Sequence, residues 1–149
     1  VAIEQGVSAI IGNSFSSLSQ VNWTEKLFNN LGKTVILEKE SQIDAVTAIS
    51  GSGPAYIFNF AETVIEIGKE LGLSEQISKK IVLQTIVGAG LLANNSDKSP
   101  SKLRENVTSP NGTTQAALNI LMDEKNGWHG IIKSAVFAAH KRSKILAKN

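Results

Sequence analysis

Cysteine is absent from this chain of 149 residues, so disulfide bonds, thiol nucleophiles and thiolate metal sites are excluded. Histidine is scarce as well: His129 and His140 lie eleven residues apart, and no third ligand stands at a useful spacing. We therefore expect surface histidines rather than an acid–base pair or a metal site, and no metal cofactor. The lack of cysteine fits a reducing compartment, and we expect a cytoplasmic protein.

Long apolar runs and an excess of one charge are also missing. No apolar run reaches the roughly 18 residues that a membrane-spanning helix needs, and no signal peptide opens the chain. The 15 basic and 13 acidic residues are interspersed, and the one basic cluster, His140–Lys144 with Lys148, is expected to be a solvated helix end. The few aromatic residues are not interleaved with basic ones. We expect a soluble protein that binds neither membranes nor nucleic acid.

The first forty residues differ in pattern from the rest. A β-prone run between glycines, Gly6–Gly12, predicts a strand, and Thr34–Glu38 predicts a second strand. Helically spaced apolar residues predict a helix over Val21–Leu31 that ends at Gly32. This β-α-β segment is too small to fold well alone, so we expect it to belong to a larger sheet.

From about residue 41 the pattern is that of a mainly α protein. Apolar spacing, caps and helix breakers predict helices over residues 54–71, 75–95, 100–107, 113–122 and 128–146. The apolar stripes on the first two helices are wide enough to bury two faces. One small bundle does not cover that much, so we expect a dimer.

A glycine pattern inside the second predicted helix matches a dinucleotide-binding fingerprint, over Gly88–Ala93. The context does not support that function, because helical spacing continues through the glycines and no second strand with an acidic end follows. We interpret the small residues as a place where another helix can approach closely.

Two segments rich in Ser, Thr, Gly and Pro are the most informative, Asp44–Tyr56 and Val107–Thr114. Each is predicted to form a tight loop at a helix start, where free N–H groups and the positive end of the helix dipole favour an anion. In the first segment, Ser52 or Gly53 is expected to cap the helix, with Pro54 at its first position. A purely structural cap is the simpler alternative for this segment.

In the second segment, Asn111 and Gly112 are expected to supply the positive φ of a tight turn. The N–H and hydroxyl groups of Gly112, Thr113 and Thr114 would then converge on one small carboxylate or phosphate. An ordinary helix entry is the simpler alternative here.

The order and spacing of these motifs resemble 1-pyrroline-5-carboxylate reductase. The matching residues are Asp44–Tyr56, Gly72-Leu73, Gln84-Thr85 with Gly88, Pro100, Leu103-Arg104 and Val107–Thr114. They cover nearly everything after residue 43. One position departs from the family pattern, because Asn111 stands where glycine is usual. Asparagine also tolerates positive φ, so the turn should survive, with a side chain that crowds or joins the substrate site.

The resemblance implies a fold and a missing part. Residues 41–149 should form a helical dimerisation and substrate-binding domain, an intertwined bundle similar to the C-terminal domain of 6-phosphogluconate-dehydrogenase-like enzymes. Residues 1–40 should be the closing β-α-β remnant of a Rossmann sheet. The family begins with a dinucleotide-binding domain that this sequence does not contain. We therefore expect a C-terminal portion that is inactive alone and forms a homodimer, with higher assembly left open.

The resemblance also implies a reaction, the reduction of 1-pyrroline-5-carboxylate to L-proline with NADPH or NADH in proline biosynthesis. Thr114 would be the catalytic residue, close to the substrate nitrogen. The substrate-binding residues would be Ser109, Asn111, Gly112, Thr113 and Thr114. The residues next to the nicotinamide cofactor would be Thr47, Ser50, Gly51, Ser52 and Gly53.

Three alternatives stay open. The chain could be a non-catalytic helical dimerisation module that keeps the fold without the chemistry. A β-hydroxyacid-type dehydrogenase tail has less support, because no catalytic lysine context stands out in the helices.

Lys102 and Arg104 are expected on a solvated helix face, with steering of an anionic substrate as the alternative.

Overall fold

The computed structural model describes residues 5–148. They form two compact units. The strand-containing unit is the chain up to Gly53 together with the segment from Ala135 onward, and the helical unit is Pro54–Ser134. The last helix, α7 (Trp128–Leu146), contributes residues to both units.

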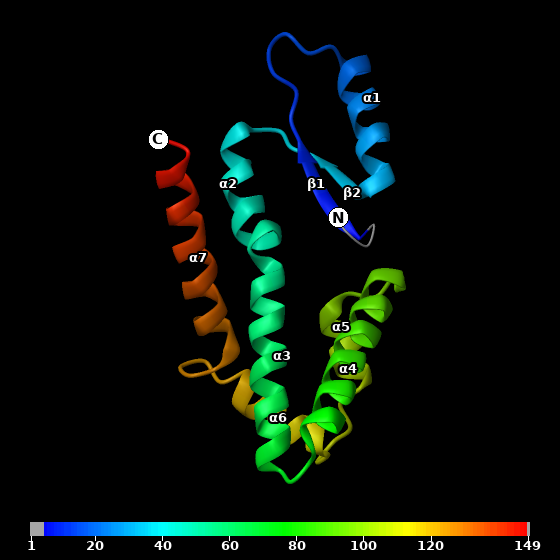
Figure 1. The fold of residues 1–149 in the computed structure, drawn as a ribbon, viewed down its shortest axis with the longest axis vertical. Helices are drawn as coiled ribbons and strands as arrows, with labels where there is room; N and C mark the ends of the chain where they lie inside the picture. The colour runs from blue at the N-terminus through cyan, green and yellow to red at the C-terminus, as the bar shows by residue number, and fades with distance from the viewer. Residues whose placement is uncertain (1–4, 149) are drawn as a thin grey trace. The chain divides into compact units, whose positions relative to one another are not determined.

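The strand-containing unit begins with a two-stranded parallel sheet, β1 (Gly6–Ile10) and β2 (Gly32–Ile36), paired in register along its whole length (Figure 1). Helix α1 (Leu18–Phe28) and a 3-10 turn, Asn29–Leu31, make the crossover between the strands. The predicted β-α-β order is confirmed. The helix starts three residues earlier than predicted, because Ser17 caps it.

The same unit continues through short helical pieces. A 3-10 turn (Glu40–Gln42) leads into helix α2 (Ile43–Val46), and α2 leads into one turn of π-helix over Thr47–Gly51, the π turn. The part of α7 that belongs to this unit lies beside α2. A hydrogen bond between Ser143 on α7 and Asp44 on α2 joins the two helices.

The helical unit opens with two long helices, α3 (Gly53–Glu70) and α4 (Glu75–Asn95), in a hairpin. Gly72 ends α3 at a φ of 91°, and the N–H groups of Gly72 and Leu73 bond back to carbonyls of the last turn. Near this turn the helices touch closely. A Cβ built on Gly68 would lie 2.6 Å from Ser78 Oγ, so only glycine fits there.

Three further helices complete the predicted set, α5 (Pro100–Asn106), α6 (Thr113–Leu121) and the start of α7. Ser99 caps α5 and Ser74 caps α4, as the sequence predicts. All five predicted helices are confirmed, and each end lies within one residue of its predicted position. The mainly α class is therefore confirmed.

Little apolar surface is buried within the chain. The buried hydrophobic residues of the described part are Ala48 and Ala61. The chain exposes 11811 Å². A globular protein of this mass exposes roughly 7,400 Å², and even two separate domains of half the mass expose roughly 8,900 Å². The apolar stripes thus lack a cover.

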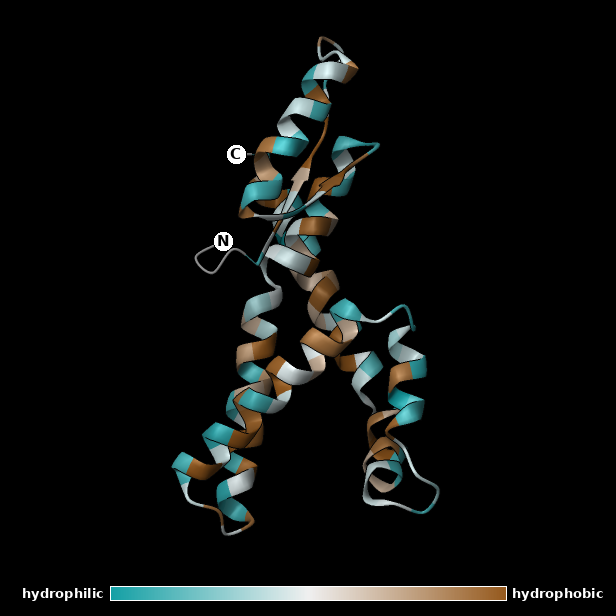
Figure 2. Ribbon diagram, turned by 90° about the vertical axis from the view of Figure 1, so that its right-hand side faces the viewer, coloured by the Kyte–Doolittle hydropathy of each residue, from teal (hydrophilic) through white to brown (hydrophobic). Residues whose placement is uncertain are grey.

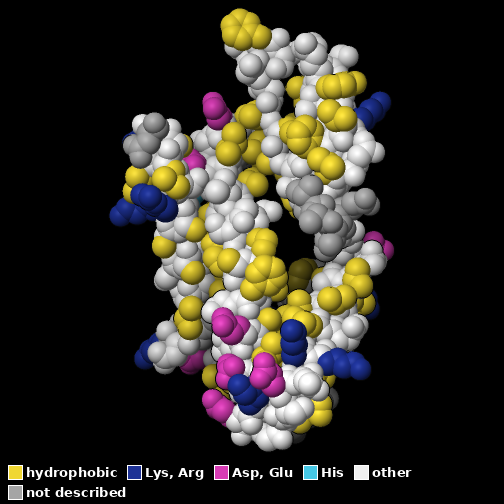
Figure 3. All heavy atoms as spheres, in the orientation of Figure 1, with side chains coloured by type: hydrophobic (Ala, Val, Ile, Leu, Met, Phe, Trp, Pro, Cys, Tyr) yellow, Lys and Arg dark blue, Asp and Glu magenta, His cyan; other side chains and the backbone are white. Residues whose placement is uncertain are grey.

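The uncovered surface includes α3 and α4, which are rich in hydrophobic residues (Figure 2) and carry exposed apolar side chains (Figure 3). The exposed residues on these helices include Ile57, Phe58, Ile67, Ile77, Ile81, Val87 and Leu91. Gly88 and Gly90 lie inside α4 rather than in a strand–turn–helix fingerprint, and a Cβ on either would meet nothing within 4 Å. No helix approaches these glycines within the described chain, so the expected close packing needs another partner.

No helix of residues 5–148 is both long and apolar enough to cross a membrane.

Candidate functional site

The first predicted site segment is not the tight loop that the sequence suggested. Residues Thr47–Gly51 form the π turn, and the N–H of Ser52 donates to the carbonyl of Thr47 at 2.8 Å. Ser52 itself has helical backbone angles, so it caps nothing. The prediction of a capped helix start here is wrong, because α2 and α3 are joined through helical backbone and the Ser52 N–H bonds inside the turn.

The position of Pro54 gives a physical reason for the π turn. A proline within continuous helical backbone clashes with the carbonyl four residues earlier, here that of Ser50. Adding one residue to the turn before the proline relieves such a clash, and π turns of this kind occur often at functional sites.

The surface of this segment is small and smooth. Gly51 and Thr47 are exposed, while Ser50, Ser52 and Gly53 are half-buried. A Cβ on Gly53 would meet nothing within 4 Å, and a Cβ on Gly51 would meet only Thr47 Cγ2, at 3.7 Å. A flat ring can approach such a surface closely, whereas a pyrophosphate, which needs several free N–H groups, has few donors here. The segment therefore fits a nicotinamide ring better than the phosphates of a dinucleotide.

The second segment is a genuine turn at a helix start. The N–H of Gly112 donates to the carbonyl of Ser109 at 3.1 Å, with Pro110 and Asn111 between them. Asn111 has a φ of 58°, and proline followed by positive φ fits a type II turn. The prediction that Asn111 tolerates the turn is confirmed. Gly112 has a φ of −83°, so the expectation of positive φ at Gly112 is wrong.

Gly112 is constrained by space instead. A Cβ at this position would collide with Ser109 Oγ and lie 3.2 Å from the Ser109 carbonyl oxygen. Its N–H is also taken by the turn, so it is not the free donor that the sequence suggested. The role left to Gly112 is to leave room beside Ser109.

Open donors remain at the start of α6. Thr113 and Thr114 are its first two residues, whose N–H groups have no acceptor inside the helix. Among residues 5–148, neither their N–H groups nor their hydroxyls make a hydrogen bond, and Gly112 provides no side-chain cap. Thr113 is exposed and Thr114 is half-buried. The start of α6 thus offers two N–H groups and two hydroxyls to an anion.

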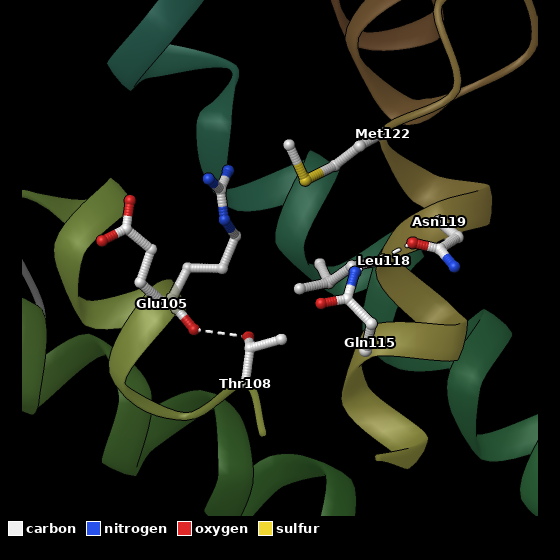
Figure 4. A pocket seen from close by; sticks show the side chains of 7 residues that line it. Glu105, Thr108, Gln115, Leu118, Asn119 and Met122 are labelled. Atoms are coloured by element: carbon white, nitrogen blue, oxygen red, sulfur yellow. Dashed lines mark hydrogen bonds between the residues drawn. The ribbon is translucent and has the colours of Figure 1, made fainter. Parts of the chain in front are cut away.

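A cavity of about 500 Å³ lies between the end of α5 and the face of α6 that carries Gln115, Leu118 and Met122 (Figure 4). Its lining residues are Arg104, Glu105, Thr108, Gln115, Leu118, Asn119 and Met122. Thr108 Oγ1 donates to the Arg104 carbonyl at 2.6 Å, and Gln115 Nε2 donates to Asn119 Oδ1 at 2.9 Å. Thr114 precedes Leu118 by four residues, so it lies on the same side of α6 as Leu118, although none of residues 109–114 lines the cavity.

The charges near this cavity are partly paired. Lys102 Nζ lies 2.9 Å from Glu105 Oε2, and this ammonium holds the pKa of the exposed Glu105 carboxyl below its usual value. Arg104 is half-buried in the cavity wall, and its guanidinium donates to Ser101 Oγ at 3.4 Å. The prediction that both basic residues lie on a fully solvated face therefore fails for Arg104.

A family model described as "Pyrroline-5-carboxylate reductase dimerisation" matches residues 40–146. The chain belongs to the pyrroline-5-carboxylate reductase family. A pyrroline-5-carboxylate reductase of Pseudomonas aeruginosa is 40% identical over 146 residues, which are 98% of this chain and 53% of that protein. One of Pisum sativum is 36% identical over 98% of this chain and 52% of its own length. The chain thus spans about half the length of these relatives.

Solved structures of pyrroline-5-carboxylate reductases agree with this assignment. The structure from Coxiella burnetii matches 97% of this chain and 53% of its own, with a TM-score of 0.92 and 33% identity. The structure from Plasmodium falciparum, which has NADP bound, matches 96% of this chain and 57% of its own, with a TM-score of 0.82 and 36% identity.

The predicted reductase site residues fall into two groups. Those of the cofactor group, Thr47 and Ser50–Gly53, lie together in the strand-containing unit. Those of the substrate group, Ser109 and Asn111–Thr114, lie together in the helical unit. The structure brings the members of each group together within their own unit.

Sequence reasoning missed two features of the reductase segment. The cavity beside α6 could have been found from the spacing of Gln115, Leu118 and Met122, which places them on one helix face. The hydrogen bond between Asp44 and Ser143 joins residues 99 positions apart, and no local pattern predicts such a pair.

Proposed function

We propose that this chain is the C-terminal portion of an enzyme that reduces 1-pyrroline-5-carboxylate to L-proline with NADPH. The open start of α6 is the observation that carries the proposal, because two N–H groups and two hydroxyls there have no partner among the described residues. A small cyclic imine with one carboxylate suits such a site. Family membership supports the same reaction.

In this proposal the substrate carboxylate binds at the start of α6. The N–H groups of Thr113 and Thr114 donate to its oxygens, and the Ser109 hydroxyl lies beside them. Gly112 leaves room for the Ser109 hydroxyl, with which a Cβ at position 112 would collide. The Asn111 amide is exposed at the tip of the turn and adds a weak contact.

Thr114 is the proposed catalytic residue. Its hydroxyl, or a water that it holds, donates a hydrogen bond to the imine nitrogen, which must gain a proton during reduction. The chemistry that bound NADPH supplies is transfer of a hydride to the imine carbon. The remaining contribution of the chain is orientation, which alone can lower a barrier by several kcal/mol.

The π turn and the residues after it are the proposed contact for the nicotinamide ring. Gly51 and Gly53 leave the space for a flat ring, and Thr47 and Ser50 border it. The phosphates of NADPH would be held by a dinucleotide-binding domain outside residues 1–149. In that arrangement residues 1–40 close the Rossmann sheet, residues 41–149 form the dimerisation and substrate domain, and the enzyme is cytoplasmic.

A homodimer is the proposed assembly. The support is the uncovered apolar surface of α3 and α4, the open space at Gly88 and Gly90, and the dimerisation family that matches this region. A second copy would cover these faces and could approach closely at the two glycines. Light scattering should give at least twice the chain mass. A particle of 15.9 kDa for this chain at micromolar concentration would contradict the proposal.

The decisive experiment is an assay of the full-length protein. Oxidation of NADPH on addition of 1-pyrroline-5-carboxylate, with formation of proline, supports the reductase. A stable dimer that binds neither compound would favour the alternative of a non-catalytic dimerisation module. Residues 1–149 alone should show no NADPH-dependent turnover, because their described part offers no pyrophosphate site.

A further inference from the structure

A hydrogen bond joins the last helix to the segment that precedes the π turn. The Ser143 hydroxyl on α7 donates to Asp44 Oδ1 on α2 at 2.6 Å, and both residues are half-buried. A hydroxyl bonded to a carboxylate at this distance is among the stronger hydrogen bonds in proteins. The proposed reaction gives no direct role to either residue.

Asp44 also bonds to the π turn through its main chain. The N–H of Thr47 donates to the carbonyls of Asp44 and Ile43, and the carbonyl of Thr47 accepts from Ser52 at 2.8 Å. Three hydrogen bonds therefore run in series from Ser143 through Asp44 and Thr47 to Ser52. The chain of bonds begins on α7 and ends at the smooth surface that is assigned to the nicotinamide ring.

The π turn has reason to need such support. A π turn is less favourable than α-helical backbone and is kept where its surroundings hold it. On one side it is packed through Ala48, which is fully buried. On the other, Asp44 fixes the turn of helix directly before it.

We propose that Asp44 and Ser143 form a positioning pair, which holds the π turn so that Thr47 and Gly51–Gly53 accept the nicotinamide end of the cofactor. This inference rests on the proposed reductase function. It assigns neither residue a contact with substrate or cofactor. The pair should therefore affect cofactor affinity and leave substrate affinity nearly unchanged.

Two variants of Ser143 with nearly the same shape test the pair in the full-length enzyme. Ser143→Thr keeps the hydroxyl, whereas Ser143→Val replaces it with a methyl group. We expect Ser143→Val to raise the Kd and the KM for NADPH by roughly tenfold, because it removes one hydrogen bond to a charged acceptor. Ser143→Thr should stay within about twofold of the wild type, and the KM for the imine should change little in both.

Asp44 provides the second arm of the test. Asp44→Ala should raise the Kd for NADPH as Ser143→Val does, and the double variant should be no worse than either single one, because both remove the same bond. Asp44→Asn keeps an acceptor oxygen and should show a smaller rise. This milder variant decides the question if Asp44→Ala or Ser143→Val does not fold.

The outcomes are distinguishable. A lowered melting temperature with unchanged NADPH affinity in Ser143→Val would show a purely structural bond and overturn the inference. Equal losses in Ser143→Thr and Ser143→Val, or additive losses in the double variant, would overturn it too. If the wild-type enzyme does not reduce the imine, only the proposed function is rejected. The Kd for NADPH, measured directly in the variants, still tests the role of Asp44 and Ser143.

Discussion

The two segments rich in Ser, Thr, Gly and Pro are alike in composition and different in structure. Thr47–Gly53 is continuous helical backbone with one widened turn, and the Ser52 N–H is used inside it. Ser109–Thr114 is a turn followed by a helix start, where two N–H groups stay open. Of the two, the second segment is the one whose described residues offer open N–H groups to an anion. The first presents a smooth surface instead.

The position of proline relative to the preceding helix accounts for the difference. Pro54 follows residues that already form α2 and the π turn, so the backbone before this proline is helical. Pro110 follows the end of α5, where Val107 and Thr108 donate back to the last carbonyls and close that helix. A proline placed after a closed helix starts a turn, and Asn111 completes it with positive φ.

The largest effect is expected at Gly112, whose lack of a side chain leaves room beside Ser109. Gly112→Val in the full-length enzyme should raise the KM for 1-pyrroline-5-carboxylate by more than about a hundredfold, as expected when charge-assisted hydrogen bonds worth about 1.5–3 kcal/mol each are lost. The Kd for NADPH should stay nearly constant, because the proposed cofactor contact is the other segment.

Steady-state kinetics and NADPH titration measure these two quantities. Gly130→Ala is the matched control, since a Cβ on this glycine of α7 would meet nothing within 4 Å. It should leave both values unchanged. A Gly112→Val enzyme with normal substrate KM would show that Ser109–Thr114 is only a helix entry.

Thr114 tests whether the open hydroxyl at the start of α6 takes part in the reaction. Thr114→Ala should lower kcat by roughly ten- to a hundredfold, the cost of losing one donated hydrogen bond of about 1.5–3 kcal/mol to the nitrogen as charge develops on it during hydride transfer. Thr114→Ser keeps the hydroxyl and should retain most of the activity. The melting temperature should hardly move, because the hydroxyl has no partner among the described residues. Equal kcat values for the two variants would remove Thr114 from the mechanism.

The sequence predicts the local structure of this chain well. Ser74, Ser99 and Gly72 mark helix ends through caps and backbone angles that depend only on neighbouring residues. The positive φ of Asn111 follows from the same local rules. Every predicted helix is present for this reason.

The predictions from sequence are wrong where distant residues or the available space determine the structure. The π turn depends on how α2 is joined to α3, and the composition of the motif does not predict this connection. The constraint on Gly112 is the nearby Ser109 side chain rather than its own φ. The pairing of Asp44 with Ser143 needs a tertiary contact across 99 positions.

A moderate effect is expected from removing the proline behind the π turn. Pro54→Ala removes the ring that would clash with the Ser50 carbonyl in a regular α-helix, so the backbone can adopt regular α-helix and shift Thr47 and Gly51. The Kd for NADPH should rise about threefold, or roughly 0.7 kcal/mol, with an unchanged KM for the imine. Pro100→Ala at the start of α5 is the control and should change neither value. Unchanged NADPH affinity in Pro54→Ala would mean that the proline does not maintain the surface offered to the ring.

The smallest effect is expected at Asn111, where the family pattern has glycine. Its main requirement is a φ of 58°, which glycine meets without strain, so Asn111→Gly should raise the KM for the imine only about twofold through loss of a weak amide contact. Asn111→Ala keeps a Cβ in the left-handed region without the short polar side chain that makes this conformation tolerable for asparagine, and should lower the free energy of unfolding by up to about 1 kcal/mol. Thermal unfolding separates this backbone cost from the substrate contact. A tenfold rise in KM for Asn111→Gly at unchanged stability would instead make the asparagine side chain a principal substrate ligand, and the departure from the family pattern would then be a change in how the carboxylate is held.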